Sequence, residues 1–169
     1  MARTFEELAG QELDALYQGA LFLSGGNARG AETLLVQSIT AAFEGYPYEI
    51  QITSVERRLE ARLVRSFLKH VTGGPPALSQ ANPGRVTLPP GSFDGLDSHQ
   101  LFRAAGAVPA WPRAALWLVL LRRWSYAEAA SAMGVERDAL VDLLRYRDAL
   151  IQAVLGSSHR STGLMGRGG

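Results

Sequence analysis

The chain has 169 residues, of which 47% are hydrophobic and 20% are charged, as in a folded protein with one domain or two small ones. It contains no cysteine, which excludes disulfides, thiolate catalysis and cysteine-based zinc sites. The net charge of +1 is small for a protein that binds DNA mainly through phosphates, so any such contact needs a local basic patch. The longest apolar run, residues 114–121, is too short to span a bilayer, and the acidic N-terminus does not resemble a signal peptide. We therefore expect a soluble, cytoplasmic protein.

Three helices are predicted in residues 1–71. Apolar residues at helical spacing begin at Phe5 and continue to Leu23, where the glycine-rich residues 24–30 interrupt the pattern. A second helix follows and ends before Pro47, because a proline disfavours helical backbone in the residue before it. A third helix begins near Ser54, a good N-cap residue. Its apolar positions lie four residues apart: Val55, Leu59, Leu63 and Phe67.

The third predicted helix carries the main basic stripe of the sequence. Between Glu56 and His70 there are five lysines or arginines against two glutamates. Four of the basic residues recur at spacings of four, three and four, which places them along one face of the helix. These are Arg58, Arg62, Arg65 and Lys69, with Arg57 beside them. The pattern predicts a contact with DNA or with an acidic partner. The alternative is an ordinary solvated face opposite the apolar positions.

A change of composition separates this part from a second helical part. Residues 72–97 are rich in Gly, Pro, Ser and Asn and are predicted to form a flexible linker, because they cannot bury enough apolar surface to offset the entropy of ordering. Residues 98–155 then show a short helix, a long helix over residues 113–123, and two helices hinged at Gly134 within residues 124–150. Residues 156–169 are predicted to be a disordered tail. The expected fold is all-α, with two small helical domains joined by a linker.

The three tryptophans lie close together in the second part. Trp117 is expected to pack in the core, whereas Trp111 and Trp124, at helix ends, suit an interface.

The second part contains residues that match a known pattern. Ser125 and Glu128 form a capping box, Ala130 lets two helices cross closely, and Gly134 suits the positive φ of a tight turn. In its order of parts the chain resembles the extracytoplasmic-function (ECF) sigma factors of bacterial RNA polymerase. The positions that match region 4 of that family are Val108, Pro109, Arg113, Leu116, Leu118, Ser125, Tyr126, Glu128, Ala130, Met133, Gly134 and Val135, and those that match region 2 are Ala31, Glu32, Leu34 and Phe43.

The resemblance implies a function in transcription initiation, with RNA polymerase core and promoter DNA as partners. It implies a region 2-like domain in residues 1–71 and a region 4-like helix-turn-helix domain in residues 98–155. Contacts with polymerase or another protein are then expected at Glu32, Leu35, Val36 and Gln37. Contacts with DNA or an acidic partner are expected at the basic stripe and at Arg137, Arg145 and Arg147.

Acidic residues in the second helix of the helix-turn-helix support other interpretations. From Glu136 to Asp148 there are three arginines against four acids, and a phosphate backbone is repelled by such a face. The family's Thr, Lys and Arg positions hold Ala139, Val141 and Leu143. One alternative is a sigma-factor mimic or adaptor that binds an anti-sigma factor or other transcription protein with little DNA recognition. Another is a regulator that uses its two parts for different protein contacts.

The sequence does not suggest an enzyme. No nucleophile lies beside a candidate base, and Asp94, Asp97 and His99 fall around the linker, where nothing fixes their geometry. We expect no catalytic residue, metal, cofactor, membrane contact or small-molecule substrate.

Overall fold

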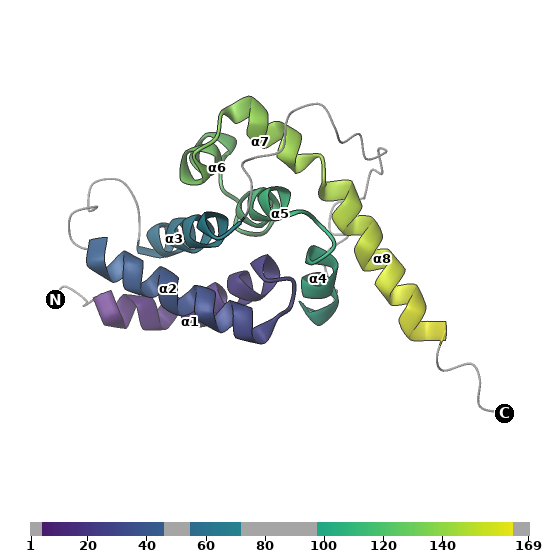
Figure 1. Ribbon diagram of the computed structural model, residues 1–169, viewed down its shortest axis with the longest axis horizontal. Coiled ribbons are helices and arrows are strands. Elements are labelled where there is room, and N and C mark those ends of the chain that lie inside the picture. Colours follow the sequence, from purple (N-terminus) through teal and green to yellow (C-terminus); the bar gives the residue numbers. More distant parts are fainter. Residues whose placement is uncertain (1–4, 46–54, 72–97, 164–169) are drawn as a thin grey trace.

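The computed structural model describes residues 5–45, 55–71 and 98–163, and within them every regular element is a helix (Figure 1). The N-terminal half contains α1 (Phe5–Leu23), α2 (Ala28–Gly45) and α3 (Val55–Lys69). The C-terminal half contains α4 (Ser98–Ala105), α5 (Ala110–Leu116), the π-helical segment η1 (Trp117–Leu121), α6 (Tyr126–Met133), α7 (Arg137–Leu144) and α8 (Arg147–Gly163). The predicted all-α fold is confirmed. The predicted linker, residues 72–97, lies outside the described residues, as do Asp94 and Asp97.

Buried apolar residues at helical spacing explain why the three helices of the N-terminal half pack together. On α2, Ala31, Leu34 and Ala42 face the core, and on α3 so do the predicted positions Leu59 and Leu63. Phe67 packs partly against the same core, while the side chain of Val55 is outside the described residues. Because each helix buries one such face, α1, α2 and α3 pack against one another.

Two glycines form the turn between α1 and α2. Gly25 and Gly26 have φ angles of 64° and 85°, which side chains with a Cβ rarely adopt. The Gly26 N–H donates to the Leu21 carbonyl at 2.8 Å and so satisfies an orphan carbonyl at the end of α1. Asn27 then caps α2, since its Oδ1 accepts the Gly30 N–H at 3.0 Å. The glycine-rich loop predicted here is thus a tight helix-to-helix turn.

The long helix predicted over residues 113–123 differs from the observed structure. It begins earlier, at Ala110, and its last turn, η1, is π-helical, with the Arg122 N–H donating to the Trp117 carbonyl at 3.0 Å. The backbone then reverses at Arg123, which has a φ of 58°. This wider turn and reversal set the direction of the segment that carries Trp124 into α6.

The second helix of the predicted hinged pair also ends earlier than expected. The sequence pattern predicts a helix as far as Leu150, but α7 stops at Leu144 and α8 starts at Arg147. The N–H of Tyr146 donates to the Leu143 carbonyl, three residues back, which tightens and ends the last turn of α7. The break allows Leu143 to be buried beside α5 while Leu150 is buried where α8 packs on α4. Because α8 continues to Gly163, residues 156–163 of the expected tail are helical.

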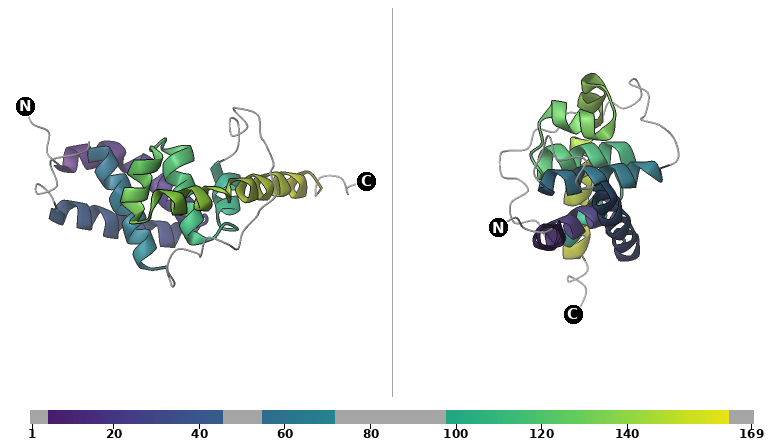
Figure 2. Two further views of the ribbon diagram at one scale, coloured as in Figure 1. Left: turned by 90° about the horizontal axis from the view of Figure 1, so that it is seen from above. Right: turned by 90° about the vertical axis from the view of Figure 1, so that its left-hand side faces the viewer.

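The two predicted domains share one core within the described residues. Figures 1 and 2 show α3 and α5 lying between the α1–α2 pair on one side and α6 and α7 on the other. Buried side chains from both halves, such as Phe22, Leu63, Trp117 and Leu140, belong to one continuous hydrophobic cluster. Trp117 is therefore a core residue, as expected. None of the described helices combines the length and apolar character needed to cross a membrane.

Candidate functional site

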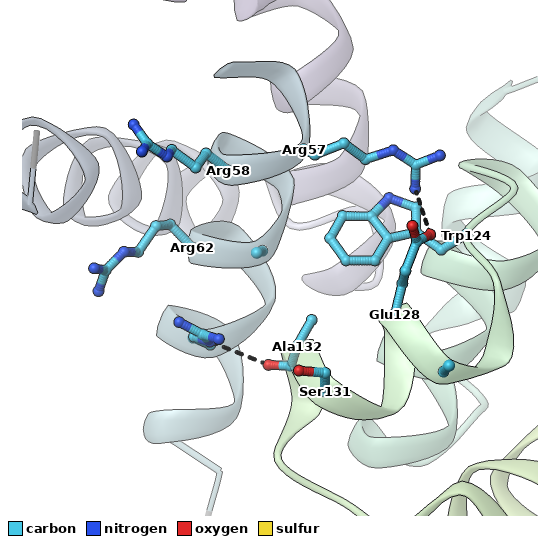
Figure 3. A pocket seen from close by; sticks show the side chains of 10 residues that line it. Arg57, Arg58, Arg62, Trp124, Glu128, Ser131 and Ala132 are labelled. Carbon is cyan, nitrogen blue, oxygen red and sulfur yellow. Dashed lines mark hydrogen bonds and ion pairs between the residues drawn. The ribbon is translucent and has the colours of Figure 1, made fainter. Parts of the chain in front are cut away.

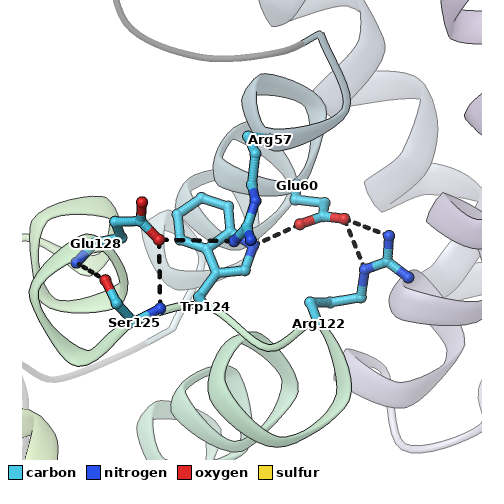
Figure 4. A network of polar contacts seen from close by, with 6 residues as sticks. All are labelled: Arg57, Glu60, Arg122, Trp124, Ser125 and Glu128. Carbon is cyan, nitrogen blue, oxygen red and sulfur yellow. Dashed lines mark hydrogen bonds and ion pairs between the residues drawn. The ribbon is translucent and has the colours of Figure 1, made fainter.

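A buried carboxylate joins α3 to the segment that precedes α6. Glu60 is only 3% exposed, and its Oε1 accepts the Nε–H of Arg122 at 2.6 Å (Figure 4). Its Oε2 accepts the indole N–H of Trp124 at 2.5 Å. A carboxylate so deeply buried is tolerated only when it is paired and hydrogen-bonded, as it is here. Arg122 also pairs with the more exposed Glu56 at 2.6 Å.

Arg57 makes the second link between α3 and α6. Its guanidinium carbon lies 4.8 Å from the centre of the Trp124 ring, a cation–π distance. Its Nη1 lies 3.9 Å from Oε2 of Glu128, at the outer limit of an ion pair. The same oxygen accepts the Ser125 N–H at 3.3 Å, while the Ser125 hydroxyl accepts the Glu128 N–H at 3.2 Å (Figure 4). Glu128 thus completes the predicted capping box and faces α3.

A tight turn at Gly134 joins α6 to α7. Gly134 has a φ of 68° and a ψ of 33°, the left-handed conformation predicted for the turn. The Val135 N–H then donates to the Ala130 carbonyl at 3.0 Å, which ends α6. Ala130 and Leu140 are buried, so small and large apolar side chains hold the two helices together.

A groove lies where α3 meets α6 (Figure 3). It has a volume of about 480 Å³. Its lining comes from both halves of the chain: Arg57, Arg58, Ala61, Arg62 and Arg65 from α3, and Trp124, Ala127, Glu128, Ser131 and Ala132 from the α6 side. The groove thus brings arginines of α3 together with Trp124, Glu128 and three small side chains from the α6 side.

The predicted basic stripe is not one exposed face. Arg58 is only 7% exposed and Arg62 is half-buried, whereas Arg65 and Lys69 are exposed. Arg65 also donates from Nε to the Ala132 carbonyl at the end of α6, at 3.2 Å. Figure 3 shows Arg58 and Arg62 pointing to one side of α3 and Arg57 to the other, over Trp124. Within the stripe, Arg65 and Lys69 therefore lie at the surface, whereas Arg58 is buried and Arg62 is partly buried.

The three arginines predicted around the second helix do not share one helix. Arg137 is the first residue of α7, Arg145 follows its end, and Arg147 begins α8. All three are exposed, but Nη2 of Arg145 lies 3.3 Å from a carboxylate oxygen of Asp142. Their positive charges therefore do not lie together on one helix.

The predicted protein-contact residues on α2 are mostly at the surface. Glu32, Val36 and Gln37 are exposed, and 65% of Val36 is accessible, which is high for a large apolar residue. Leu35 is half-buried and packs against the core, because it lies on the inner side of the same helix. Phe43, seven residues after Val36, is also exposed and lies on the same face of α2.

Comparison with protein-family models, with curated proteins and with solved structures gives no match for this chain. The described residues contain no group of three or more His, Cys, Asp or Glu side chains placed to hold a metal ion. The charged residues that line the α3–α6 groove are four arginines and one glutamate.

Arg113 is a structural residue whose role the sequence did not indicate. It lies on α5, and its Nη1 donates to the Leu23 carbonyl at the end of α1 at 2.5 Å. Its Nε and Nη2 donate to the Val108 carbonyl at 3.2 and 2.7 Å, and the guanidinium lies 5.9 Å from the ring centre of Phe67. Burial lowers the pKa of Arg113. In the sequence, Arg113 stands out only through its match to the family pattern. That match does not indicate which groups the side chain contacts.

Proposed function

We propose that the protein is a regulator of bacterial transcription initiation, similar in organisation to an ECF sigma factor, that binds RNA polymerase core and promoter DNA. The observation that carries the proposal is the α6–α7 unit. Its capping box at Ser125 and Glu128 and its left-handed turn at Gly134 coincide with the residues that match the family pattern.

The exposed face of α2 supports the protein-binding part of the proposal. Val36 and Phe43 present apolar surface, with Glu32 and Gln37 nearby on the same helix. Apolar side chains bordered by polar ones are typical of the anchor positions of protein interfaces. In sigma factors the corresponding helix carries polar positions that contact polymerase, and in this chain those positions hold Thr33, Val36 and Gln37.

A second candidate function is favoured by the surface of α7. Glu136 and Asp138 are exposed at its start, and the charge of Arg145 is offset by Asp142. A helix with this balance of charge gains little from a phosphate backbone. The alternative is therefore a sigma-factor mimic or adaptor that binds an anti-sigma factor or other transcription protein with little DNA recognition.

The decisive experiment is recovery of the affinity-tagged full chain from its native cell, followed by DNA protection assays at low salt. Under the first proposal, core polymerase subunits are recovered and the recovered complex protects promoter fragments. Recovery of a small partner protein without polymerase, and without DNA protection, favours the mimic. If neither polymerase nor a transcription protein is recovered, both proposals fail.

A pair of surface variants tests the role of α2. Val36→Glu introduces charge at the proposed contact, whereas Leu13→Glu makes the same change at an exposed apolar position of α1. We expect Val36→Glu to lower polymerase recovery about tenfold, as for loss of an interface anchor. Leu13→Glu should leave recovery unchanged, and equal loss in both variants would contradict the assignment of this face.

A further inference from the structure

We propose that a pocket between the start of α2 and the end of α3 binds a small aromatic carboxylate. The pocket has a volume of about 490 Å³. Small-molecule sites usually have volumes of about 300–1,000 Å³. The α1–α2 turn lines one end of the pocket, and α2 and α3 line its sides; it shares no lining residue with the α3–α6 groove. The proposal goes beyond the proposed function and does not rest on it.

The opposite directions of α2 and α3 determine which side chains meet in this pocket. Figure 1 shows α2 and α3 running in opposite senses, and the two helices pack against each other, so the start of α2 lies beside the end of α3. Arg29 and His70 therefore belong to the same end of the pocket, next to the turn that carries Ser24. Phe67 comes one helical turn before His70, and Leu34 comes more than one turn after Arg29. The pocket thus has a polar end and an apolar part.

The two charged or ionisable side chains of the lining are both basic. Arg29 and His70 are exposed, and the described lining residues include no acid. Within the described residues, neither side chain has an ion-pair partner. The planar guanidinium of Arg29 matches the two oxygens of a carboxylate, and such charge-assisted hydrogen bonds are among the stronger polar contacts. Because Arg29 is the one permanent cation of the described lining, a ligand with a single negative charge is the better match.

Uncharged hydrogen-bond donors lie at the same end of the pocket. The Ser24 hydroxyl is half-buried, and none of the described residues hydrogen-bonds to it. Asn27 uses its Oδ1 to accept the Gly30 N–H at 3.0 Å, which leaves its amide NH₂ as a donor. A carboxylate accepts hydrogen bonds and donates none, so it suits an end that offers donors.

The apolar part of the pocket accounts for the aromatic ring of the ligand. Leu34 is buried and Phe67 is half-buried, and both line the pocket. The guanidinium of Arg113, 5.9 Å from the ring centre, helps to hold the ring of Phe67 in place. A ligand ring packed against Phe67 gains an aromatic contact and removes apolar surface from water. An anion without a ring, such as inorganic phosphate, covers none of this surface.

The test is a calorimetric titration of the full chain with naphthalene-2-carboxylate at low salt. Naphthalene-2-carboxamide is the matched ligand, because it has the same ring without the charge. We expect the carboxylate to bind about tenfold more tightly than the amide, since the amide lacks the charge-assisted hydrogen bonds to Arg29. In amide NMR spectra, the signals that shift with the carboxylate should cluster in residues 24–37 and 67–70.

Two pairs of variants locate the site. Thr33→Glu places a carboxylate in the lining and should weaken binding about tenfold, whereas Thr40→Glu makes the same change at an exposed position of α2 outside the pocket. Arg29→Gln should weaken binding about threefold to tenfold, and Arg137→Gln at the start of α7 is its control. Both controls should bind like the unchanged chain, and circular dichroism verifies that each variant is folded.

Four outcomes would overturn the proposal. The first is absence of saturable binding of naphthalene-2-carboxylate, and the second is equal affinity for the carboxylate and the amide, which would indicate apolar adsorption only. The third is an equal effect of Thr33→Glu and Thr40→Glu. The fourth is displacement of the ligand by an equal concentration of inorganic phosphate, which would indicate a general anion site. The titration uses the chain alone, so its result is independent of any polymerase or other transcription partner.

Discussion

The indole N–H of Trp124 donates a hydrogen bond of 2.5 Å to Glu60, a residue 64 positions earlier in the chain. This bond links α3 to the segment that leads into α6, and Arg122 completes the pairing of the same carboxylate. The π-helical turn at residues 117–121 and the reversed backbone at Arg123 bring both donors to Glu60. The position of α6 beside α3 therefore depends on a few polar contacts as well as on the shared core.

Glu60→Ala should destabilise the protein strongly. The substitution leaves the buried indole N–H of Trp124 without its acceptor and removes a partner of Arg122, so we expect a loss of about 2–4 kcal/mol in the free energy of unfolding. Urea denaturation followed by circular dichroism measures this loss. Glu56→Ala is the matched control, because it removes a more exposed partner of the same arginine and should cost less than about 1 kcal/mol. Equal losses in the two variants would contradict the role given to Glu60.

Gly19→Ala tests the packing of α1 against η1. A Cβ at Gly19 would overlap the indole ring of Trp117, so the buried ring or the helix would have to move. We expect a loss of about 1–3 kcal/mol in unfolding free energy, as for other overpacked cores. Gly10→Ala is the control on the same helix, where a Cβ meets nothing within 4 Å; a gain of about 0.5–1 kcal/mol is expected there. If Gly19→Ala did not change the free energy of unfolding, the contact between α1 and Trp117 would be loosely packed.

The sequence predicted features that are encoded locally. The apolar spacing of Leu59 and Leu63, the capping box at Ser125 and the turn at Gly134 each depend on residues within one or two helical turns. These are the features that a periodicity or capping argument can detect. The all-α class and the start of most helices followed from them.

The long-range features could not be predicted in this way. Nothing near Glu60 in the sequence indicates that its partners are Arg122 and Trp124, and nothing near Arg113 indicates the Leu23 carbonyl. The same limitation affected the basic stripe. Helical spacing places Arg58 and Arg65 near one face, but only the packing decides that Arg58 is buried and that Arg65 contacts α6. Charge spacing alone therefore predicts more exposed basic surface on α3 than the structure has.

Gly134→Ala should weaken the turn between α6 and α7. The turn needs a φ of 68°, which is strained for a residue with a Cβ, although the surrounding space is open. We expect a loss of about 1–2 kcal/mol in unfolding free energy. Gly134→Asn should lose less, because asparagine tolerates the left-handed conformation better. Thermal unfolding of the two variants gives the comparison, and an equal loss would mean that the turn changes conformation in the variants.

Ser125→Ala should destabilise the start of α6 by about 1 kcal/mol, because it removes the hydroxyl that accepts the Glu128 N–H. Ser125→Asp should retain most of the stability, since a carboxylate can accept the same bond and is favourable at a helix N-terminus. Native-state hydrogen exchange of the amides in α6 measures the effect locally. Unchanged exchange in Ser125→Ala would show that the cap does not contribute to the stability of α6.

Arg113→Lys should show whether the contact between α1 and α5 depends on the shape of the guanidinium. Arg113 donates in two directions, to the Leu23 carbonyl and to the Val108 carbonyl, which a single ammonium group cannot do with the same geometry. We expect Arg113→Lys to lose about 1–2 kcal/mol in unfolding free energy, and Arg113→Met to lose about 2–4 kcal/mol because both carbonyls then lack this donor. Arg103→Lys, at an exposed position of α4, is the control and should be neutral. If Arg113→Lys were also neutral, the positive charge alone would be sufficient at this position, and the two-way hydrogen bonding seen here would not be what holds α5 to the end of α1.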